Sequence, residues 1–399
     1  MDRNELERRY AAGERDFRDI NLAGANLSGI NLSGANLAGA SLGSANLSKA
    51  SLRGANLAGA FLFGADLSFA KLSEANLIDA DLTKANLKGA VLVKTNLKSA
   101  KLSGAILTAV NLSGANLEGV NLSGANLSGI NLRSANLIEA KLSWANLTGA
   151  RMSGTKLTAA SLNGIKLKGA WLNGVDLHGA DLDGVDMSEA KLNGTNFTKA
   201  NLPAANLNDA QMRLANLTQV NLRAANLHGT SLTKANLIDA NLSKADMNEA
   251  HLSGANLSGA NLNGTSLCEA DLSKADLSSA YLWAANLDVA NLSGANLDGA
   301  SMRGASLESA DMKNAHYNDQ TMFPAGFDPL KSGQLNKTLE LKPTEPIALQ
   351  DNETRLQQTE TAVSKTTPPT QPTAGNSTGS SATKSGGGLF GRLFGRKAS

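Results

Sequence analysis

The chain contains few of the residues that build a conventional globular core or a redox site. Its 399 residues include one cysteine, Cys268, so no internal disulfide can form, and a reducing compartment suits it. Aromatic residues make up only 4% of the sequence, which indicates an interior too narrow for rings. No segment approaches the roughly 18 apolar residues of a membrane span, and the charged N-terminal residues lack the apolar region of a signal peptide. These absences favour a cytoplasmic location.

The patterns that usually mark catalytic or metal chemistry are also missing. The four histidines are scattered, and with one cysteine they form no metal-ligand spacing. There is no P-loop, no dinucleotide-binding fingerprint and no supported Ser/His/Asp arrangement. Acidic residues between 176 and 189 resemble a calcium loop only faintly, because their spacing departs from D-x-D-x-D-G. We therefore predict no enzyme activity, no cofactor and no metal.

A five-residue period runs from Ile20 to Ala315 without a slip. Its central position, from Leu22 to Met312, is nearly always leucine, and a small or β-branched residue stands two positions earlier. On an α-helix a step of five residues rotates by about 140°, so the leucines would spiral around the axis. In a strand the side chains alternate between faces, so an odd period would split the leucines between both sides. The chain must therefore turn once in every unit.

One unit, from Ala25 to Gly29, illustrates the predicted path. Ala25 and Leu27 share an inward face, Asn26 points outward, and the chain turns through Ser28 and Gly29. A repeat this short can bury its apolar face only by stacking on its neighbours. The period therefore predicts a solenoid with an interior of leucine and alanine.

The tandem units Ala-Asn-Leu-Ser-Gly and Ala-Asp-Leu-Ser-Lys resemble the pentapeptide repeat family, whose pattern is A-(D/N)-L-x-x, and look most like its cytosolic cyanobacterial members. The resemblance implies an all-β fold, a right-handed quadrilateral β-helix with four units per coil and about 15 coils in this chain. Residues 20 apart would then stack, so Asn36, Asn56 and Asn76 would begin a column of bonded amides.

The repeats do not extend over the whole sequence. An open solenoid end would expose apolar core and strand edges, so a cap is required. Composition after the repeats turns to Thr, Ser, Gln, Pro and Gly, which is typical of disorder. The predicted regions are an N-terminal capping helix (1–15), the pentapeptide-repeat β-helix (16–320), a C-terminal plug (321–330), a disordered linker (331–388) and a short basic amphipathic tail (389–399).

Two groups of residues are candidates for interaction. Outward rings on a flat β surface can anchor a partner, or they can cover neighbouring coils. The tail would, as a helix, gather apolar side chains beside arginines, which suits an anionic membrane surface or a partner groove; the alternative is a tail without function. The candidates are Phe61, Phe63, Phe69, Trp144, Tyr281 and Trp283 in the repeats, and Leu389, Phe390, Arg392, Leu393, Phe394 and Arg396 in the tail.

The charge balance separates the remaining functions. The net charge is +2, and the repeats alone are about −1 with lysines interspersed, so we expect no direct nucleic-acid binding. The first hypothesis is a non-catalytic structural or protein-interaction scaffold in the cytoplasm, whose tail docks to the inner face of a membrane or to a partner. The resemblance also implies an alternative, a DNA-mimicking protein that binds DNA gyrase. A duplex carries a negative charge about every 1.7 Å, and these near-neutral repeats do not.

Overall fold

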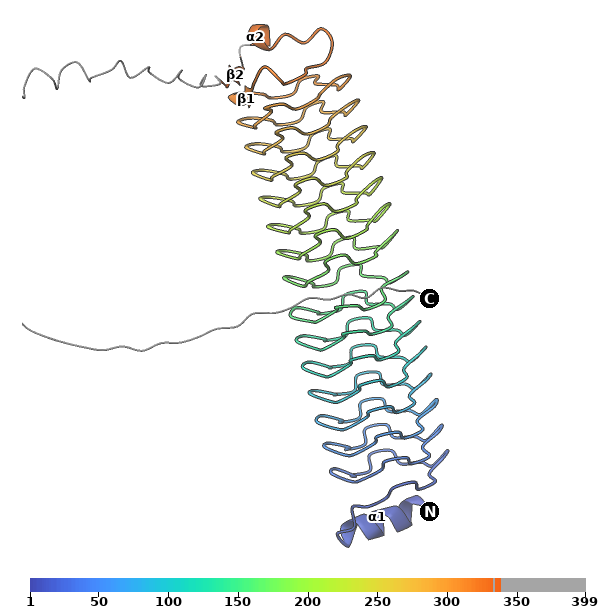
Figure 1. The fold of residues 1–399 in the computed structure, drawn as a ribbon. Coiled ribbons are helices and arrows are strands. Elements are labelled where there is room, and N and C mark those ends of the chain that lie inside the picture. The colour runs from blue at the N-terminus through green and yellow to red at the C-terminus, as the bar shows by residue number, and fades with distance from the viewer. Residues whose placement is uncertain (333, 339–399) are drawn as a thin grey trace, which may run out of the picture. The chain divides into compact units, whose positions relative to one another are not determined.

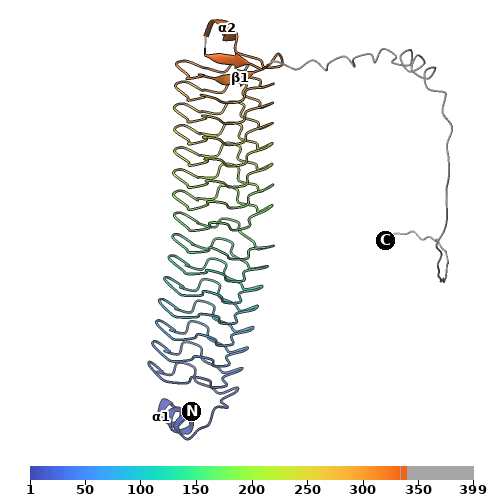
Figure 2. The ribbon, with the colours of Figure 1, turned by 90° about the vertical axis from the view of Figure 1, so that its left-hand side faces the viewer.

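The computed structural model describes residues 1–332 and 334–338 (Figure 1). Helix α1 spans Arg3–Ala11, strand β1 Ala315–Tyr317, helix α2 Pro329–Ser332 and strand β2 Leu335–Lys337. Between α1 and β1 the chain winds through successive stacked turns (Figures 1 and 2). Most of the predicted linker and the whole predicted tail, with its six candidate residues, lie outside the described residues.

Parallel backbone bridges hold the repeats together. Each bridge joins a residue to the residue 20 positions later, as Asn36 pairs with Asn56 and Asn56 with Asn76. The Asn56 amide donates to Ala35 O of the preceding layer at 2.9 Å, and Leu57 donates to Asn76 O of the following layer at 2.7 Å. Twenty residues are four units, and we call this length a coil. Residues 20 apart therefore stack, as the sequence predicts.

The interior consists of the central leucines and the small residues two positions before them. Leu27, Leu127 and Leu227 are fully buried, and so are most of the alanines in the small position. Five threonines replace alanine there, and each hydroxyl donates to a carbonyl 23 residues earlier, as Thr95 Oγ1 does to Leu72 O at 2.9 Å. Within the described residues, no buried side-chain nitrogen or oxygen lacks a partner. The predicted leucine and alanine interior is confirmed.

Outward asparagines fasten one layer to the next. Asn56 Nδ2 donates to Asn36 Oδ1 at 3.0 Å, and Asn76 Nδ2 donates to Asn56 Oδ1 at the same distance. Asn36 Oδ1 also accepts from the Ala38 amide two residues on, which supports the turn. This part of the predicted amide column is confirmed, and the role of these asparagines is structural.

Each unit ends in a tight turn whose second central residue has a positive φ. The Ala25 amide donates to Leu22 O at 3.1 Å, and Gly24 has φ 66°, as in a type II turn. At 32 such positions the residue is not glycine; Lys49, Trp144 and Val289 are examples. An L side chain in this conformation costs about 1–2 kcal/mol, so the inter-coil bonds impose the turn on residues that do not prefer it.

Helix α1 closes the first coil, as predicted. Asp2 caps it by accepting from the Glu5 amide at 2.8 Å. Leu6 is fully buried, and the Tyr10 hydroxyl donates to Ser33 O of the repeats at 2.7 Å. The Arg15 guanidinium lies 3.8 Å from the centre of the Tyr10 ring. The helix therefore covers apolar core that would otherwise face water.

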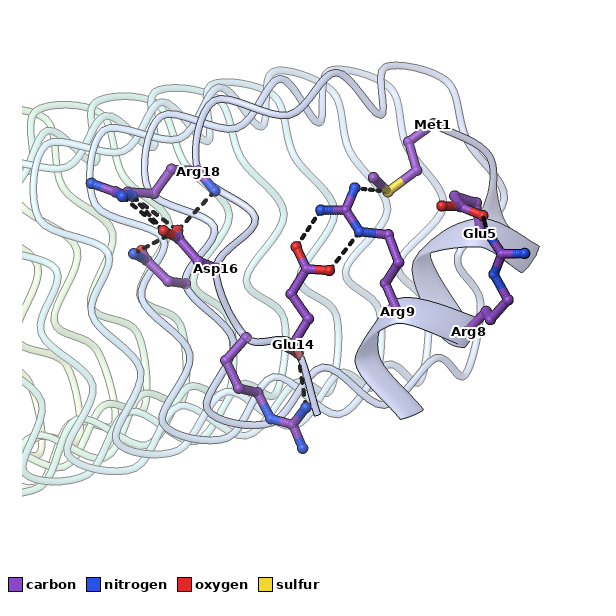
Figure 3. Close-up of polar contacts among 9 residues, drawn as sticks. Met1, Glu5, Arg8, Arg9, Glu14, Asp16 and Arg18 are labelled. Atoms are coloured by element: carbon purple, nitrogen blue, oxygen red, sulfur yellow. Dashed lines mark hydrogen bonds and ion pairs between the residues drawn. The ribbon is translucent and has the colours of Figure 1, made fainter. Parts of the chain in front are cut away.

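Exposed ion pairs surround the junction of α1 with the first coil (Figure 3). Arg9 hydrogen-bonds Glu14, and this bond lowers the pKa of the Glu14 carboxyl. Arg18 Nη2 contacts Asp16 Oδ2 at 2.7 Å, and this pairing lowers the pKa of the Asp16 carboxyl. Both carboxylates are thus held in their charged form at the end of the stack.

The other end of the stack differs from the prediction in one respect. Phe323 packs edge-on against Tyr317 at 5.4 Å and stacks with Phe327 at 5.0 Å, so aromatic rings cover the last coil. The residues from 331 onward were expected to be disordered, but α2 continues to Ser332 and β2 pairs in parallel with β1. The strand forms because the half-buried Leu335 packs against the core and Lys337 pairs with Asp319.

Candidate binding surface around Trp144

The six candidate rings of the repeats fall in separate places. Phe61 and Phe63 stack with centroids 6.1 Å apart, and Lys84 Nζ lies 5.9 Å from the Phe63 ring. Tyr281 and Trp283 occupy the same two positions eleven coils later, about 50 Å away at the usual spacing of neighbouring strands. All four side chains are exposed. The structure therefore brings Phe61 and Phe63 together but does not gather the six rings into one patch.

Phe69 and Trp144 stand at turn positions with positive φ, and each ring lies over a glycine of the next coil. A Cβ placed on Gly89 would come within 2.6 Å of the Phe69 ring, and one on Gly164 within 2.4 Å of the Trp144 ring. Trp144 nevertheless remains 74% exposed. One edge of each ring therefore covers a neighbouring coil, while the rest of the ring faces solvent.

Beside Trp144 the bridge ladder opens. Bridges join Arg151 with Trp171 and Lys166 with Asp186, but among the described residues none joins 156 with 176 or 161 with 181. The backbone amides of 157, 159, 162, 164, 176 and 181 make no hydrogen bond in the described structure. A crevice of about 230 Å³ results, and its lining includes Leu157, Leu162, Asp176, His178 and Asp181.

Crowding in the small core position explains this opening. Thr155, Val175 and Thr195 stack directly on one another where alanine is usual, and Ile165 and Val185 do the same in the opposite column. No other column of the repeats carries three β-branched residues in succession. Excess core volume displaces the backbone, and Ala160 and Ala180, which flank the crevice, become half-exposed. The sequence contains this signal, but it emerges only when residues are compared at intervals of 20.

A shallow depression of about 370 Å³ continues from the crevice to the Trp144 ring. Asn163, Gly164, Asp181 and Asp183 line it together with the ring. An apolar ring, backbone donors without acceptors and two exposed carboxylates are thus gathered at one place. Among the described residues, no group of three or more His, Cys, Asp or Glu side chains could hold a metal ion.

Sequence reasoning missed several exposed apolar side chains, among them Trp171, Leu214 and Val289. Trp171 stands at an outward bridge position, and Leu214 and Val289 stand at positive-φ turn positions. All three are exposed, Trp171 by 44%. Their place within the five-residue unit would have identified them, because only the central and small positions point inward.

In the described part of the chain, no helix has the length and apolar character needed to cross a bilayer.

The period, the stacking and the turn geometry define a class of protein. The family described as pentapeptide repeats matches this sequence in overlapping segments that together run from residue 16 to residue 314. The chain belongs to the pentapeptide repeat family. Members of this family fold as right-handed β-helices and are generally structural or interaction proteins.

Several solved structures are similar to this chain. HetL, a pentapeptide repeat protein involved in heterocyst differentiation regulation from the cyanobacterium Nostoc sp. strain PCC 7120, is 29% identical, with 81% of this chain and 99% of HetL covered and a TM-score of 0.29. Rfr23 from the cyanobacterium Cyanothece 51142 is 32% identical over 38% of this chain and 96% of its own, with a TM-score of 0.23. QnrB1, a plasmid-mediated fluoroquinolone resistance protein, is 21% identical over 44% and 91%, with a TM-score of 0.25. No curated protein sequence matches this chain.

Proposed function

We propose that this protein is a non-catalytic scaffold that binds a protein partner through the surface around Trp144. The observation that carries the proposal is the position of this ring, which is 74% exposed yet held against Gly164 of the next coil. Tryptophan is enriched among the residues that dominate binding energy. A ring that is already ordered loses little conformational entropy when a partner arrives.

The chemistry beside the ring indicates the kind of segment that fits. The unbonded amides of Leu157 and Leu162 are donors, so they suit the carbonyl groups of an extended chain. The exposed carboxylates of Asp181 and Asp183 suit basic side chains. An extended segment that carries lysine or arginine and one large apolar side chain would satisfy all three features.

Proximity labelling in the native cell tests this surface. Trp144→Ala should remove a defined subset of labelled proteins, whereas Lys244→Ala should not. Lys244 is a matched control because it occupies the same column and the same positive-φ turn position five coils later. If both variants label the wild-type set with equal intensity, Trp144 is not part of a binding surface.

The tail provides a second, separable part of the proposal. We propose that the protein is cytoplasmic and that residues 389–399 dock to an anionic surface at the inner face of a membrane, or to a partner. Arg392 and Arg396 beside paired Leu and Phe residues support this proposal. Deletion of residues 386–399 should shift the protein from the membrane to the soluble fraction or remove a partner. An unchanged distribution and an unchanged partner set would contradict it.

The arrangement of the repeats supports a scaffold more than a DNA mimic. We propose about 15 coils with a quadrilateral section, in keeping with the 20-residue bridge spacing. Lysines and arginines lie among the acids over much of this length, whereas a duplex carries only negative charge. A gyrase supercoiling assay should show no inhibition at micromolar protein, and inhibition would favour the DNA-mimicking alternative.

A further inference from the structure

Charged side chains are sorted onto different columns of the stack, although the repeats are nearly neutral. The unit that contains Lys94 and the units stacked on it at intervals of 20 residues, from residue 91 to residue 254, form a set that we call the basic face. It contains six lysines and arginines and no Asp or Glu: Lys94, Arg133, Arg151, Lys191, Arg213 and Lys234. The preceding unit of each coil, from residue 186 to residue 309, carries eight acids and no Lys or Arg: Asp186, Glu189, Asp209, Asp246, Glu249, Glu269, Asp288 and Glu308.

The basic face has an exposed ring at its centre. Bridges join Arg151 to Trp171 and Trp171 to Lys191, so the backbone of Trp171 lies between the backbones of two cationic residues, about 4.8 Å from each along the stack. Leu214 is also exposed, beside Arg213. None of the six cations forms an ion pair with another described residue. Their charges are therefore available to an external partner.

Side-chain hydrogen bonds support the backbone beneath part of this face. Asn173 Oδ1 accepts from the Asn193 amide at 3.0 Å, and Asn193 Oδ1 accepts from the Arg213 amide at 3.0 Å. These bonds run along the basic face itself, in addition to the bridges. The cations from Lys94 to Lys234 span seven coils, or about 34 Å. Successive cations are separated by about one or two coils, or about 5–10 Å along the stack.

We propose that the basic face binds an acidic, extended segment of a partner polypeptide, with an apolar side chain of that segment seated on Trp171. In an extended chain, every second side chain points the same way, at a spacing of about 6.6 Å. The long side chains of Lys and Arg on adjacent coils can reach acids at this spacing. This surface adds to the scaffold role proposed above, and it is distinct from the surface around Trp144.

A protein segment fits better than a nucleic acid. Single-stranded nucleic acids bind where several aromatic rings stack successive bases, whereas this face offers Trp171, the imidazole of His251 four coils away and the aliphatic Leu214. The neighbouring acidic column, which overlaps the basic face between residues 186 and 254, would repel a wide phosphate chain. A single narrow polypeptide can remain on the basic row.

Fluorescein-labelled poly-L-glutamate is the probe for this test, titrated against the full-length protein at low and physiological ionic strength. Arg151→Glu with Lys191→Glu should weaken binding by at least about tenfold. The control pair is Lys101→Glu with Lys141→Glu, which occupies bridge positions of another column, has the same separation of 40 residues and changes the charge equally. The control should change binding by less than about twofold.

Trp171→Ala tests the role of the ring with a glutamate–tyrosine copolymer. Wild-type protein should prefer this copolymer to poly-L-glutamate, and the variant should lose the preference, whereas Trp283→Ala should keep it. Trp144→Ala should bind poly-L-glutamate normally, so failure of the earlier proposal and failure of this one give different results.

Four results would overturn the inference. The first is that poly-L-glutamate does not bind at all. The second is that the two charge-reversal pairs weaken its binding equally, which would indicate an effect of net charge alone. The third is that single-stranded oligo(dT) binds more tightly than poly-L-glutamate, which would make the basic face a nucleic-acid site. The fourth is that the wild-type protein self-associates and that Arg151→Glu with Lys191→Glu abolishes this self-association, which would make the acidic column of a second copy the occupant.

Discussion

Replacing Thr155, Val175 and Thr195 together with alanine should close the crevice. The six unbonded amides beside it could each regain a bond with a net value of about 1 kcal/mol, or roughly 6 kcal/mol in all. The lost apolar burial, at about 0.8 kcal/mol per methyl group, and the two threonine hydrogen bonds remove about 4–5 kcal/mol of this. Global stability should therefore change little, while the local ladder becomes ordered.

Amide hydrogen exchange measures the local change directly. In the wild type, residues 157–164 should exchange much faster than residues 97–104, whose ladder is intact. In the triple variant the exchange of 157–164 should slow by about tenfold to a hundredfold, which corresponds to roughly 1.4–2.7 kcal/mol of local stabilisation. The control is Val110→Ala with Ile130→Ala, because these two β-branched residues stack where the ladder is closed. That pair should not slow exchange in any segment.

Two results would refute the reasoning. If residues 157–164 of the wild type exchange as slowly as residues 97–104, the ladder is closed in solution. Alternatively, exchange stays fast in the triple variant, in which case crowding by β-branched side chains is not what separates these coils.

The remaining predictions address the ring, the core and the cap. Gly164→Ala and Gly184→Ala should each lower the free energy of unfolding by about 1–2 kcal/mol, because both glycines have φ near +60°. Only Gly164→Ala should also shift the fluorescence of Trp144, which is measured with the other two tryptophans replaced by phenylalanine. Leu127→Ala should destabilise the protein by about 2–5 kcal/mol in urea unfolding and Leu127→Met by less than about 1.5 kcal/mol; equal effects would contradict the packed interior. The lowered pKa of Glu14 means that its pairing with Arg9 stabilises the fold above the ordinary carboxyl pKa of about 4 and is lost as the pH falls through the folded-state value. The melting temperature of wild type should therefore exceed that of Glu14→Gln at pH 6, and the difference should shrink as the pH falls below the ordinary carboxyl pKa. A difference independent of pH would rule this out.

The features that the sequence predicts are those that the repeat itself encodes. An odd period excludes both regular elements, so the buried leucines, the outward asparagines and the turn in each unit follow without coordinates. Helix α1 was also predictable, because an uncapped end is unfavourable and Leu6 and Tyr10 lie on one side of it. Strand β2 was not, because it pairs with β1 across 20 residues that no longer follow the repeat.

The candidate surfaces depend on neighbours that are distant in sequence. Trp144 was predicted to face outward from its position alone, but the crevice beside it arises from Thr155, Val175 and Thr195, which meet only after stacking. The basic face was hidden for a similar reason. Summed along the chain, its cations cancel against acids that lie on other columns, so a net charge near zero conveys nothing about any one side.

The 20-residue spacing also determines which changes in length such a chain can tolerate. Loss or gain of one five-residue unit would keep every leucine inside, so folding alone would not oppose it. Every later side chain would nevertheless shift to the adjacent column. If the change lay between Trp171 and Lys191, then Lys191, Arg213 and Lys234 would no longer stack in one column with Arg151 and Trp171. An insertion or deletion of four units preserves the phase and merely lengthens or shortens the row, so surviving indels in related sequences should come in multiples of twenty wherever a whole face is under selection.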